Sequence, residues 1–233
     1  MRLVTGDSIV DAWKAGGSQL AHASGHAINN LITEIAQPWE FDPAWLKLFN
    51  PMSVGGADRL SVVASVLFPS RSKLRGESRK SYYARHSRIL ERARKSRRVR
   101  SAWGSTYFER LVSFEGTTNQ IERAVAALSS WPKRSSAAIV MHTSAPHMDG
   151  LRTRGSPCLQ YLEVLWNPDD SLDLVAVYRN HDFVNKALGN FLGLARLLQF
   201  LADESGKPIG KLVCHSVHAY ADRVTQLRAL LTR

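Results

Sequence analysis

The sequence predicts an α+β fold in which helices cover one face of a β-sheet. Its 233 residues, 44% of them hydrophobic, are enough to bury one sizeable core. Two apolar, strand-like segments flank the turn sequence Asn167-Pro168-Asp169-Asp170, which predicts a β-hairpin. Helical patterns lie on both sides of this hairpin, and such a mixture is typical of α+β proteins. We therefore expect a single domain over residues 1–233.

The first half of the chain alternates short apolar segments with glycine and proline. Ile9 and Trp13 fit an amphipathic helix, which Gly16 and Gly17 are expected to end. Residues 27–36 are apolar and leave helix and strand open. Further helices are predicted at residues 45–49, 60–68 and 78–98, the last because it contains neither Pro nor Gly.

The second half carries the remaining strand predictions. Asn119 is placed to cap a helix in which Ile121, Val125 and Leu128 share one face. Strands are predicted at residues 137–141, 158–166, 172–179 and 212–220, and helices at residues 190–203 and 224–231. The helix at 190–203 is apolar on nearly all sides, so we expect it to be central and buried.

The whole formal net charge of +11 lies in one basic segment, from Arg71 to Arg100. This segment holds 13 of the 31 Lys and Arg residues but only two of the 20 Asp and Glu residues. Clustered arginines can bind a polyanion, such as a polyglutamate tail, a nucleotide phosphate or a nucleic-acid backbone. The alternative is a solvated helix whose apolar residues, Tyr82, Tyr83, Ile89 and Leu90, pack inward.

Cysteine content and hydropathy predict a cytoplasmic protein. The chain has two cysteines, Cys158 and Cys214, which is too few for a disulfide framework or a cysteine-rich metal site. No apolar run approaches the ~20 residues that span a bilayer, and the N-terminus lacks the apolar stretch of a secretory signal. Both thiols are therefore expected to be free.

A series of short motifs follows in order between residues 103 and 220. They are Trp103-Gly104, Asn119-Gln120-Ile121, Pro157-Cys158, Tyr178-Arg179-Asn180-His181-Asp182, Asn190 and His218-Ala219-Tyr220. Each motif alone is common, but the ordered set resembles the conserved half of the thymidylate synthases and the related pyrimidine hydroxymethylases. Those enzymes carry Tyr-Gly, Asp-Gln-Ile, Pro-Cys, Gln-Arg-Ser-x-Asp, a pyrimidine-reading Asn and His-x-Tyr at these places.

The resemblance implies a thymidylate-synthase-like layered fold with a curved mixed β-sheet and a homodimer formed through the sheet face. It also implies methylation or hydroxymethylation at C5 of a pyrimidine nucleotide, with 5,10-methylenetetrahydrofolate as cofactor. In that chemistry a cysteine thiolate adds at C6 of the ring and makes C5 nucleophilic. Cys158 would be the nucleophile, and Arg179 would favour its ionised form.

The other matching residues would bind the substrate and the cofactor. Asn190 would read the base, and its amide complements the O4 acceptor and N3–H donor of uracil. His218 and Tyr220 lie two apart on a predicted strand, so both face the same side and can meet one sugar hydroxyl. The resemblance implies that Asp182 contacts the folate and that Asn180 helps to bind the nucleotide.

Several departures from the family motifs weaken this assignment. The phosphate-binding Arg-Thr-Gly motif has no counterpart before residue 50, and the expected paired arginines are replaced by Ser135, Ser136 and Ala137. The candidates to replace them are Lys133, Arg134, Arg152 and Arg154, which are otherwise solvated loop charges. Ser65 stands nearest to the place of the catalytic glutamate. Lys186 and Leu188 replace a Gly and a Pro, and we expect the closing C-terminal segment of the family to be missing after Arg233.

Each candidate residue also has an ordinary structural interpretation. Cys158 can be a small buried strand residue, His218 a core histidine and Arg179 a surface cation. Asn190 can cap its helix, although capping and base reading are compatible. The main alternative to an enzyme is therefore a catalytically inactive nucleotide-binding or assembly protein on the same fold. A nucleic-acid-binding module is a third possibility, based on charge alone.

Overall fold

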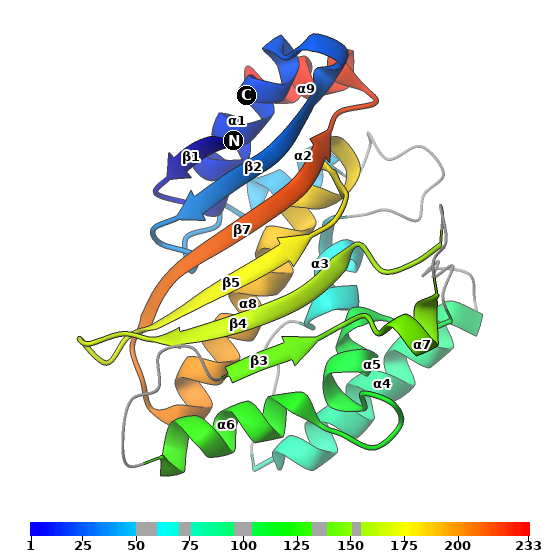
Figure 1. Cartoon of the computed structure of the whole chain (residues 1–233), viewed down its shortest axis with the longest axis vertical. Helices are drawn as coiled ribbons and strands as arrows, with labels where there is room; N and C mark the ends of the chain where they lie inside the picture. The colour runs from blue at the N-terminus through cyan, green and yellow to red at the C-terminus, as the bar shows by residue number, and fades with distance from the viewer. Residues whose placement is uncertain (50–59, 70–75, 96–103, 132–138, 151–154) are drawn as a thin grey trace.

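The computed structural model describes residues 1–49, 60–69, 76–95, 104–131, 139–150 and 155–233. In this part of the chain, a mixed sheet has the strand order β1-β2-β7-β5-β4-β3, and the short strand β6 pairs with β7 (Figure 1). The strands are β1 (Arg2–Gly6), β2 (Ala27–Ile35), β3 (Ile139–His142), β4 (Leu159–Trp166), β5 (Leu172–Tyr178), β6 (His181–Asp182) and β7 (Ile209–Tyr220). The pairs β1·β2, β5·β7 and β6·β7 are parallel, and the others are antiparallel.

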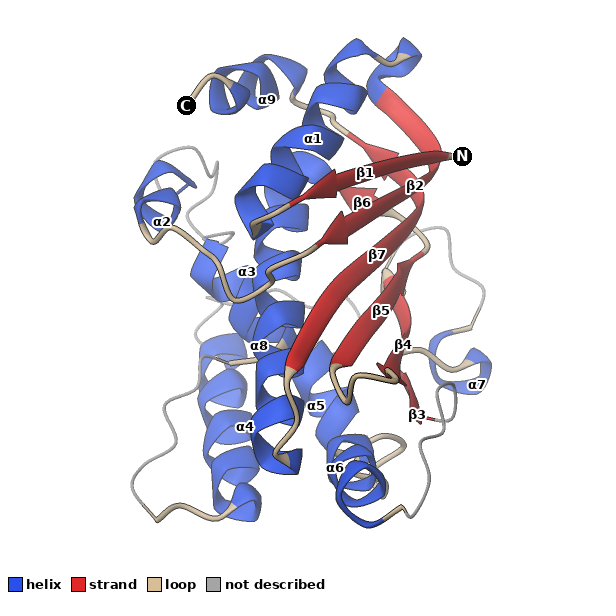
Figure 2. Cartoon of the chain, turned by 90° about the vertical axis from the view of Figure 1, so that its left-hand side faces the viewer, coloured by secondary structure: helices blue, strands red, loops and turns tan. Residues whose placement is uncertain are grey.

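The described helices account for most of the remaining chain. They are α1 (Ile9–His22), α2 (Ala44–Phe49), α3 (Leu60–Leu67), α4 (Arg79–Lys95), α5 (Tyr107–Val112), α6 (Gln120–Ser130), α7 (Pro146–Asp149), α8 (Leu188–Ser205) and α9 (Val224–Leu231). A short 3₁₀ turn, η1 (Ser24–His26), precedes β2, and a single π-helical turn, η2 (Phe183–Ala187), leads into α8. Figure 2 shows α1, α3 and α8 together on one face of the sheet. The predicted α+β class is confirmed.

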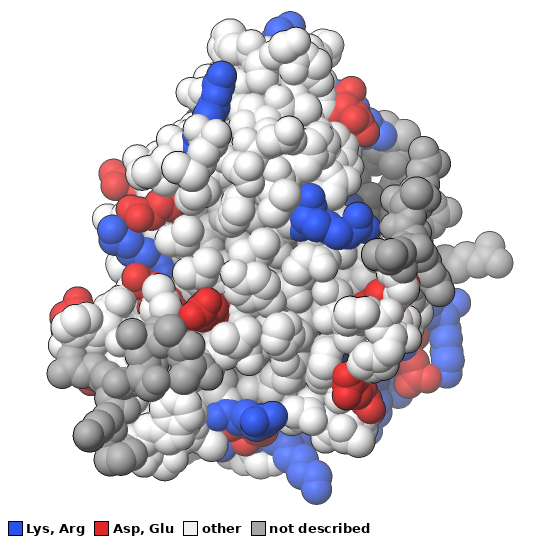
Figure 3. Space-filling model, viewed as in Figure 1, with Lys and Arg blue, Asp and Glu red and all other residues white. Residues whose placement is uncertain are grey.

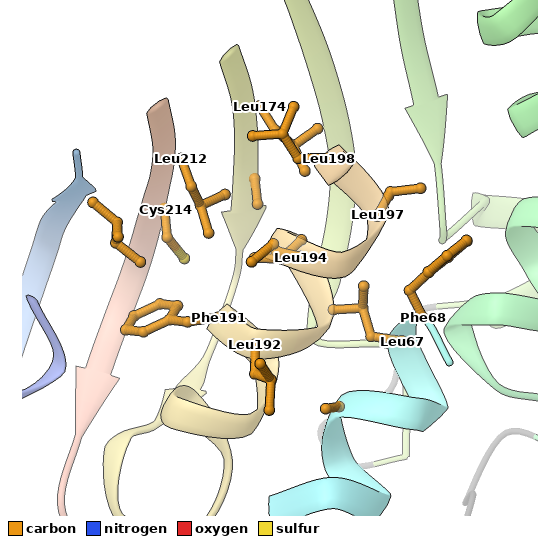
Figure 4. Packing of buried hydrophobic residues seen from close by; sticks show 14 of the residues in the cluster. Leu67, Phe68, Leu174, Phe191, Leu192, Leu194, Leu197, Leu198, Leu212 and Cys214 are labelled. Carbon is orange, nitrogen blue, oxygen red and sulfur yellow. The ribbon is translucent and has the colours of Figure 1, made fainter. Parts of the chain in front are cut away.

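The core lies between α8 and the sheet. Leu194 and Leu198 of α8 are buried against strand residues such as Leu174 and Leu212 (Figure 4). On its other side α8 packs closely on α3, because a Cβ atom on Gly193 would lie only 2.8 Å from a backbone oxygen of that helix. The helix is buried on nearly all sides, as its composition predicts. Asn190, in its first turn, is therefore held in the centre of the molecule.

The prediction that Gly16 and Gly17 end the first helix is wrong. α1 continues to His22, and both glycines are buried within it. A Cβ atom on Gly16 would lie 2.6 Å from the ring of Phe183, and one on Gly17 would lie 3.1 Å from the side chain of Leu227. These glycines permit close packing and do not act as helix breakers, because tertiary contact overrides the local propensity.

The N-terminal region also resolves an open question and adds an element. Residues 27–35, which left helix and strand open, form β2 between β1 and β7. β1 was not predicted, because only Val4 of its five residues is buried and the strand carries little hydrophobic pattern.

The basic segment forms a helix, as expected, and part of its charge is neutralised within the protein. Among its described residues, Tyr82, Tyr83 and Leu90 are buried, whereas Ile89 is 48% exposed and does not pack inward. Four cations form ion pairs, which are Arg79 with Glu122 and Glu204, Arg85 with Glu77, Arg94 with Glu109, and Lys95 with Glu91. Much of α4 is thus fixed to the neighbouring helices by its arginines.

The second face of the sheet carries few charged groups. In β5 and β7 the buried positions alternate with half-buried ones, so Val175, Val177 and Val213 point away from the helices. Figure 3 views the molecule from this side and shows mainly uncharged surface at its centre. No helix in the described part of the chain is long and apolar enough to cross a membrane.

Candidate active site

Three strands bring the candidate residues together at one end of the sheet. The parallel strands β5 and β7 both end here, and β4 begins here. The backbone N–H of Arg179 donates to the carbonyl of Cys158 at 2.8 Å, so these two residues are direct neighbours across the β4–β5 pair. In the same region Asp182 of β6 is paired in register with Tyr220 of β7.

Cys158 is half-buried, and a tyrosine fixes its backbone. The hydroxyl oxygen of Tyr107 accepts hydrogen bonds from the backbone N–H groups of Cys158 (3.1 Å) and Leu159 (3.2 Å). Tyr107 opens α5 directly after Thr106, which forms a capping box with Glu109. The sequence analysis missed Tyr107, although the Thr-x-x-Glu capping signal marks the start of its helix.

The charges around the Cys158 thiol oppose one another. Burial raises its pKa, the cations of Arg179 and Lys186 lower it, and the carboxylate of Asp182 raises it. The net direction is upward, because desolvation of a thiolate outweighs the two cations. Arg179 is therefore near the thiol, as the resemblance implied, but the thiol of the free protein is predominantly protonated at neutral pH.

Arg179 also shapes the loop that carries the thiol. Its Nε donates to the carbonyl of Pro157 (3.0 Å), and its Nη2 donates to the carbonyl of Ser156 (3.1 Å). A cleft of about 290 Å³ lies beside this contact and is lined by Ser144, Ala145, Pro146, Asp149, Gly150, Ser156, Pro157, Gln160 and Arg179. The guanidinium thus holds the backbone next to the nucleophile and borders an accessible space.

Asp182 begins the π-helical turn that connects β6 to α8. Its Oδ1 accepts from the backbone N–H groups of Val184 and Asn185, and its Oδ2 accepts from the Asn185 side chain. Burial raises the pKa of the neighbouring Tyr220 to about 12, and Asp182 contributes in the same direction. The carboxylate is therefore fixed in orientation at the same end of the sheet as the thiol.

The predicted sugar-binding residues form a second small group. His218 and Tyr220 face the same side, with ring centroids 5.7 Å apart and planes 21° apart. The Nδ1 of His218 lies 2.8 Å from Oδ1 of Asn180, so this amide orients the imidazole. The structure thus joins three of the residues that the motifs singled out.

Asn190 is only 6% exposed and contacts a histidine that the sequence analysis did not assign a role. Its Nδ2 lies 3.1 Å from Nε2 of His181, and Nδ1 of His181 lies 2.8 Å from the hydroxyl of Ser216. His181 lies inside one of the motifs, but its burial among three aromatic rings could not be read from the sequence. The amide of Asn190 is therefore oriented from behind by buried groups.

One matching motif has a structural explanation. Asn119 caps α6 by accepting from the backbone N–H of Glu122 at 2.9 Å, as predicted. The amide of Gln120 exchanges two hydrogen bonds with the backbone of His142, at 2.7 and 2.8 Å, and also donates to the carbonyl of Arg110. Ile121 is fully buried. This motif joins α6 to α5 and to the edge strand β3, whose His142 pairs with Tyr161 of β4.

Some predicted residues lie outside the described part of the chain. These are Arg134 and the other candidate phosphate ligands Lys133, Arg152 and Arg154, together with Trp103, Ser135, Ser136 and Ala137. Ser65 is described, and its hydroxyl donates to the carbonyl of Ser61 in its own helix. Among the described residues, no group of three His, Cys, Asp or Glu side chains is arranged to hold a metal ion.

Comparisons with known proteins extend the resemblance. No family model matches the chain. A protein of Methanococcoides burtonii named "Putative thymidylate synthase" is 30% identical over 115 residues, which is 49% of this chain and 51% of that protein. Proteins of the same name from Methanosarcina barkeri and Methanosarcina mazei match with the same identity and coverage. Over about half of its length the chain is therefore similar to proteins named "Putative thymidylate synthase". The resemblance drawn from the motifs is confirmed, and the thymidylate-synthase-like match spans about half the length of each relative.

Proposed function

We propose that this thymidylate-synthase-like protein transfers a one-carbon unit to C5 of a uridine-type nucleotide, with Cys158 as nucleophile. One observation carries the proposal, which is the half-buried residue Cys158 with two cations beside its thiol at the end of the sheet. The three archaeal relatives support the family of the reaction. The substrate, the product and the residue roles are our inferences.

In the proposed reaction the thiolate of Cys158 bonds to C6 of the pyrimidine. The π electrons of the C5–C6 bond move toward the C4 carbonyl, so C5 becomes nucleophilic. Arg179 and Lys186 favour the thiolate, and Tyr107 holds the backbone on which the sulfur is mounted. C5 then forms a bond to the one-carbon electrophile. When the C5 proton has passed to solvent, the sulfur leaves C6 and the ring regains its double bond.

The remaining residues would bind the nucleotide. Asn190 would recognise the edge of the base, because an amide supplies a donor and an acceptor side by side. His218 and Tyr220 would contact a sugar hydroxyl, with Asn180 holding the histidine in place. The phosphate ligands, among which we include Arg134, belong to segments outside the described residues.

The described residues fit a folate cofactor at Asp182. Oδ2 of Asp182 accepts one hydrogen bond from Asn185, and the side chain is half-exposed, so this oxygen retains capacity for an N–H donor of a pterin ring. When bound, 5,10-methylenetetrahydrofolate supplies the one-carbon unit as an electrophile. We include Asp182 as its ligand in the proposal, together with a homodimer formed through the open sheet face.

The decisive experiment uses 5-fluoro-2′-deoxyuridine 5′-monophosphate with methylenetetrahydrofolate, followed by intact mass and peptide mapping. We expect a covalent adduct on Cys158, because fluorine at C5 blocks the final elimination. The adduct should be absent in Cys158→Ala, whose folding is checked by thermal melting. An adduct mapped to another residue, or one that persists in Cys158→Ala, would refute the proposed nucleophile.

The second candidate is a nucleotide-binding protein without catalysis. The raised pKa of Cys158 favours it, because a protonated thiol is a poor nucleophile. It is supported if pyrimidine nucleotides bind but form no adduct at any pH up to 10.

A polyanion role for the basic segment would instead require salt-sensitive oligonucleotide binding that charge reversal at Lys80, Arg88 and Arg92 removes. These three form no ion pair with a carboxylate in the described residues.

A further inference from the structure

Behind Asn190 lies a buried relay of polar side chains that the proposed chemistry does not use. It runs from Asn190 to His181, then to Ser216 and Cys214. All four are buried, and His181 and Cys214 are at most 1% exposed. The imidazole is locked by a parallel stack on Tyr178, with centroids 4.2 Å apart and planes 2° apart, and by the ring edges of Phe183 and Phe191. Such a side chain cannot turn over without disturbing the core.

The relay fixes the position of each proton. Burial lowers the pKa of His181 to about 3, so the imidazole is neutral at working pH and carries one N–H. Nδ2 of Asn190 can only donate, so Nε2 of His181, which lies 3.1 Å away, carries no proton. The single proton is therefore on Nδ1, which donates to the Ser216 oxygen 2.8 Å away. The bare Nε2 of His181 then accepts from Nδ2 of Asn190.

This arrangement decides which atom of Asn190 is turned toward a ligand. Its nitrogen is held by His181, so Oδ1 points the other way. No hydrogen bond reaches Oδ1 from the described residues, and it is not among the fully buried polar atoms that lack a partner. Oδ1 of Asn190 is thus available to accept a hydrogen bond from a ligand, and the contact with His181 keeps the amide from flipping.

We infer that His181 is a specificity-determining positioning residue whose Nδ1–H tautomer, paired with the Ser216 oxygen, holds Asn190 in the orientation that selects uracil over cytosine. This inference rests on the proposed function. Uracil offers an N3–H donor beside the O4 acceptor, which matches Oδ1 and the second N–H of Asn190. Cytosine offers the reverse pattern, an N3 acceptor beside an N4 donor, and would place its N3 lone pair against Oδ1. The opposite histidine tautomer would donate to a reversed amide and favour cytosine.

Two measurements test the inference. The first is ¹⁵N NMR of histidine-labelled protein without ligand, in which the His181 resonances report the tautomer. The second is the ratio of dissociation constants for 2′-deoxyuridine and 2′-deoxycytidine 5′-monophosphates in wild type and variants. Ser216→Ala removes the acceptor for Nδ1–H, and Ser216→Thr restores a hydroxyl. Thr33→Val is the matched control, because Thr33 is a fully buried hydroxyl residue paired with Cys214 on the neighbouring strand.

We expect the Nδ1–H tautomer in wild type and in Thr33→Val. The preference for the uridine nucleotide should fall about tenfold in Ser216→Ala and recover in Ser216→Thr, with Thr33→Val unchanged. An Nε2–H tautomer in wild type, or an unchanged preference in folded Ser216→Ala, overturns the inference alone. Wild-type protein that binds neither nucleotide overturns the proposed function, and the inference about base selection fails with it.

Discussion

At the scale of single residues, the candidate site depends on the half-buried thiol of Cys158, and its surroundings have opposite effects on the pKa of that thiol. Desolvation raises the pKa of Cys158, while Arg179 and Lys186 lower it. We predict that iodoacetamide alkylates Cys158 with a pH midpoint above about 8.5, the ordinary value for cysteine. Removing a cation must raise the midpoint further, so Lys186→Met should move it upward. The matched control is Lys80→Met, on the exposed side of α4.

Intact-mass kinetics from pH 6 to 10 measure both effects. Cys214 should stay unmodified in the folded protein, because it is fully buried and burial raises its pKa to about 12. A midpoint below 8 in wild type, or equal midpoints in wild type and Lys186→Met, would contradict this account of the thiol.

Tyr107 is the residue on which the placement of the thiol depends. Removing its hydroxyl in Tyr107→Phe leaves two strand N–H groups without their acceptor, which costs about 1–3 kcal/mol of stability. Urea denaturation followed by fluorescence measures the loss. Tyr161→Phe, on the half-exposed face of β4, should change stability by less than about 0.5 kcal/mol. If Tyr107→Phe and Tyr161→Phe were equally stable, the hydrogen bonds to the Tyr107 hydroxyl would not contribute to stability.

The sequence was sufficient to predict several residues of the candidate site, but it did not predict the residues that hold them in place. Cys158, Arg179, Asp182 and Tyr220 do gather at one end of the sheet, because strand order and register bring them there. Tyr107 and His181 were missed, since a buried tyrosine or histidine has no periodic signature that separates it from the core. The direction of the thiol pKa was also missed, because burial is a property of the packed fold.

At the scale of secondary structure, the strands and helices with strong periodicity were predictable and the contacts between them were not. The β4–β5 hairpin and α8 follow from alternation, turn residues and an apolar run. α1 extends past Gly16 and Gly17 because these glycines pack against the bulky side chains of Phe183 and Leu227. No local sequence pattern predicts these contacts. The π-helical turn η2 likewise depends on the Asp182 cap, a feature of three-dimensional geometry.

The α3–α8 contact gives a prediction at this scale. Gly193→Ala ordinarily strengthens a helix by about 1 kcal/mol, but here the new methyl group meets the Ala64 carbonyl at 2.8 Å. We expect a net loss of about 1–3 kcal/mol from overpacking. Ala126→Gly, on the exposed side of α6, reports the propensity effect alone. Thermal unfolding of both proteins tests this, and a stabilised Gly193→Ala would show that the helices can separate without cost.

The ion pair between α5 and α7 offers a contrast between buried and exposed charges. Arg110 and Asp149 are each 6% exposed in their side chains and form two hydrogen bonds of 2.7 Å. Asp149→Ala leaves a buried guanidinium without this partner and should cost about 3–5 kcal/mol. Glu91→Ala breaks the exposed pair with Lys95 and should leave the stability almost unchanged, because water screens this pair. Comparable losses in the two variants, measured by urea denaturation, would contradict this distinction.

At the scale of the whole molecule, the described helices cover one face of the sheet, and Val175, Val177 and Val213 lie near the centre of the other face. An exposed sheet face of this composition is suited to bury itself against a second copy, as the proposed homodimer requires. We predict that the wild-type protein has the mass of a dimer by light scattering. Val175→Arg should convert it to a monomer, because a twofold interface would bury the new charge twice. Ile89→Arg, on the exposed side of α4, is the control and should remain dimeric. A monomeric wild type would refute the interface, since the open valine face would then be stable in water.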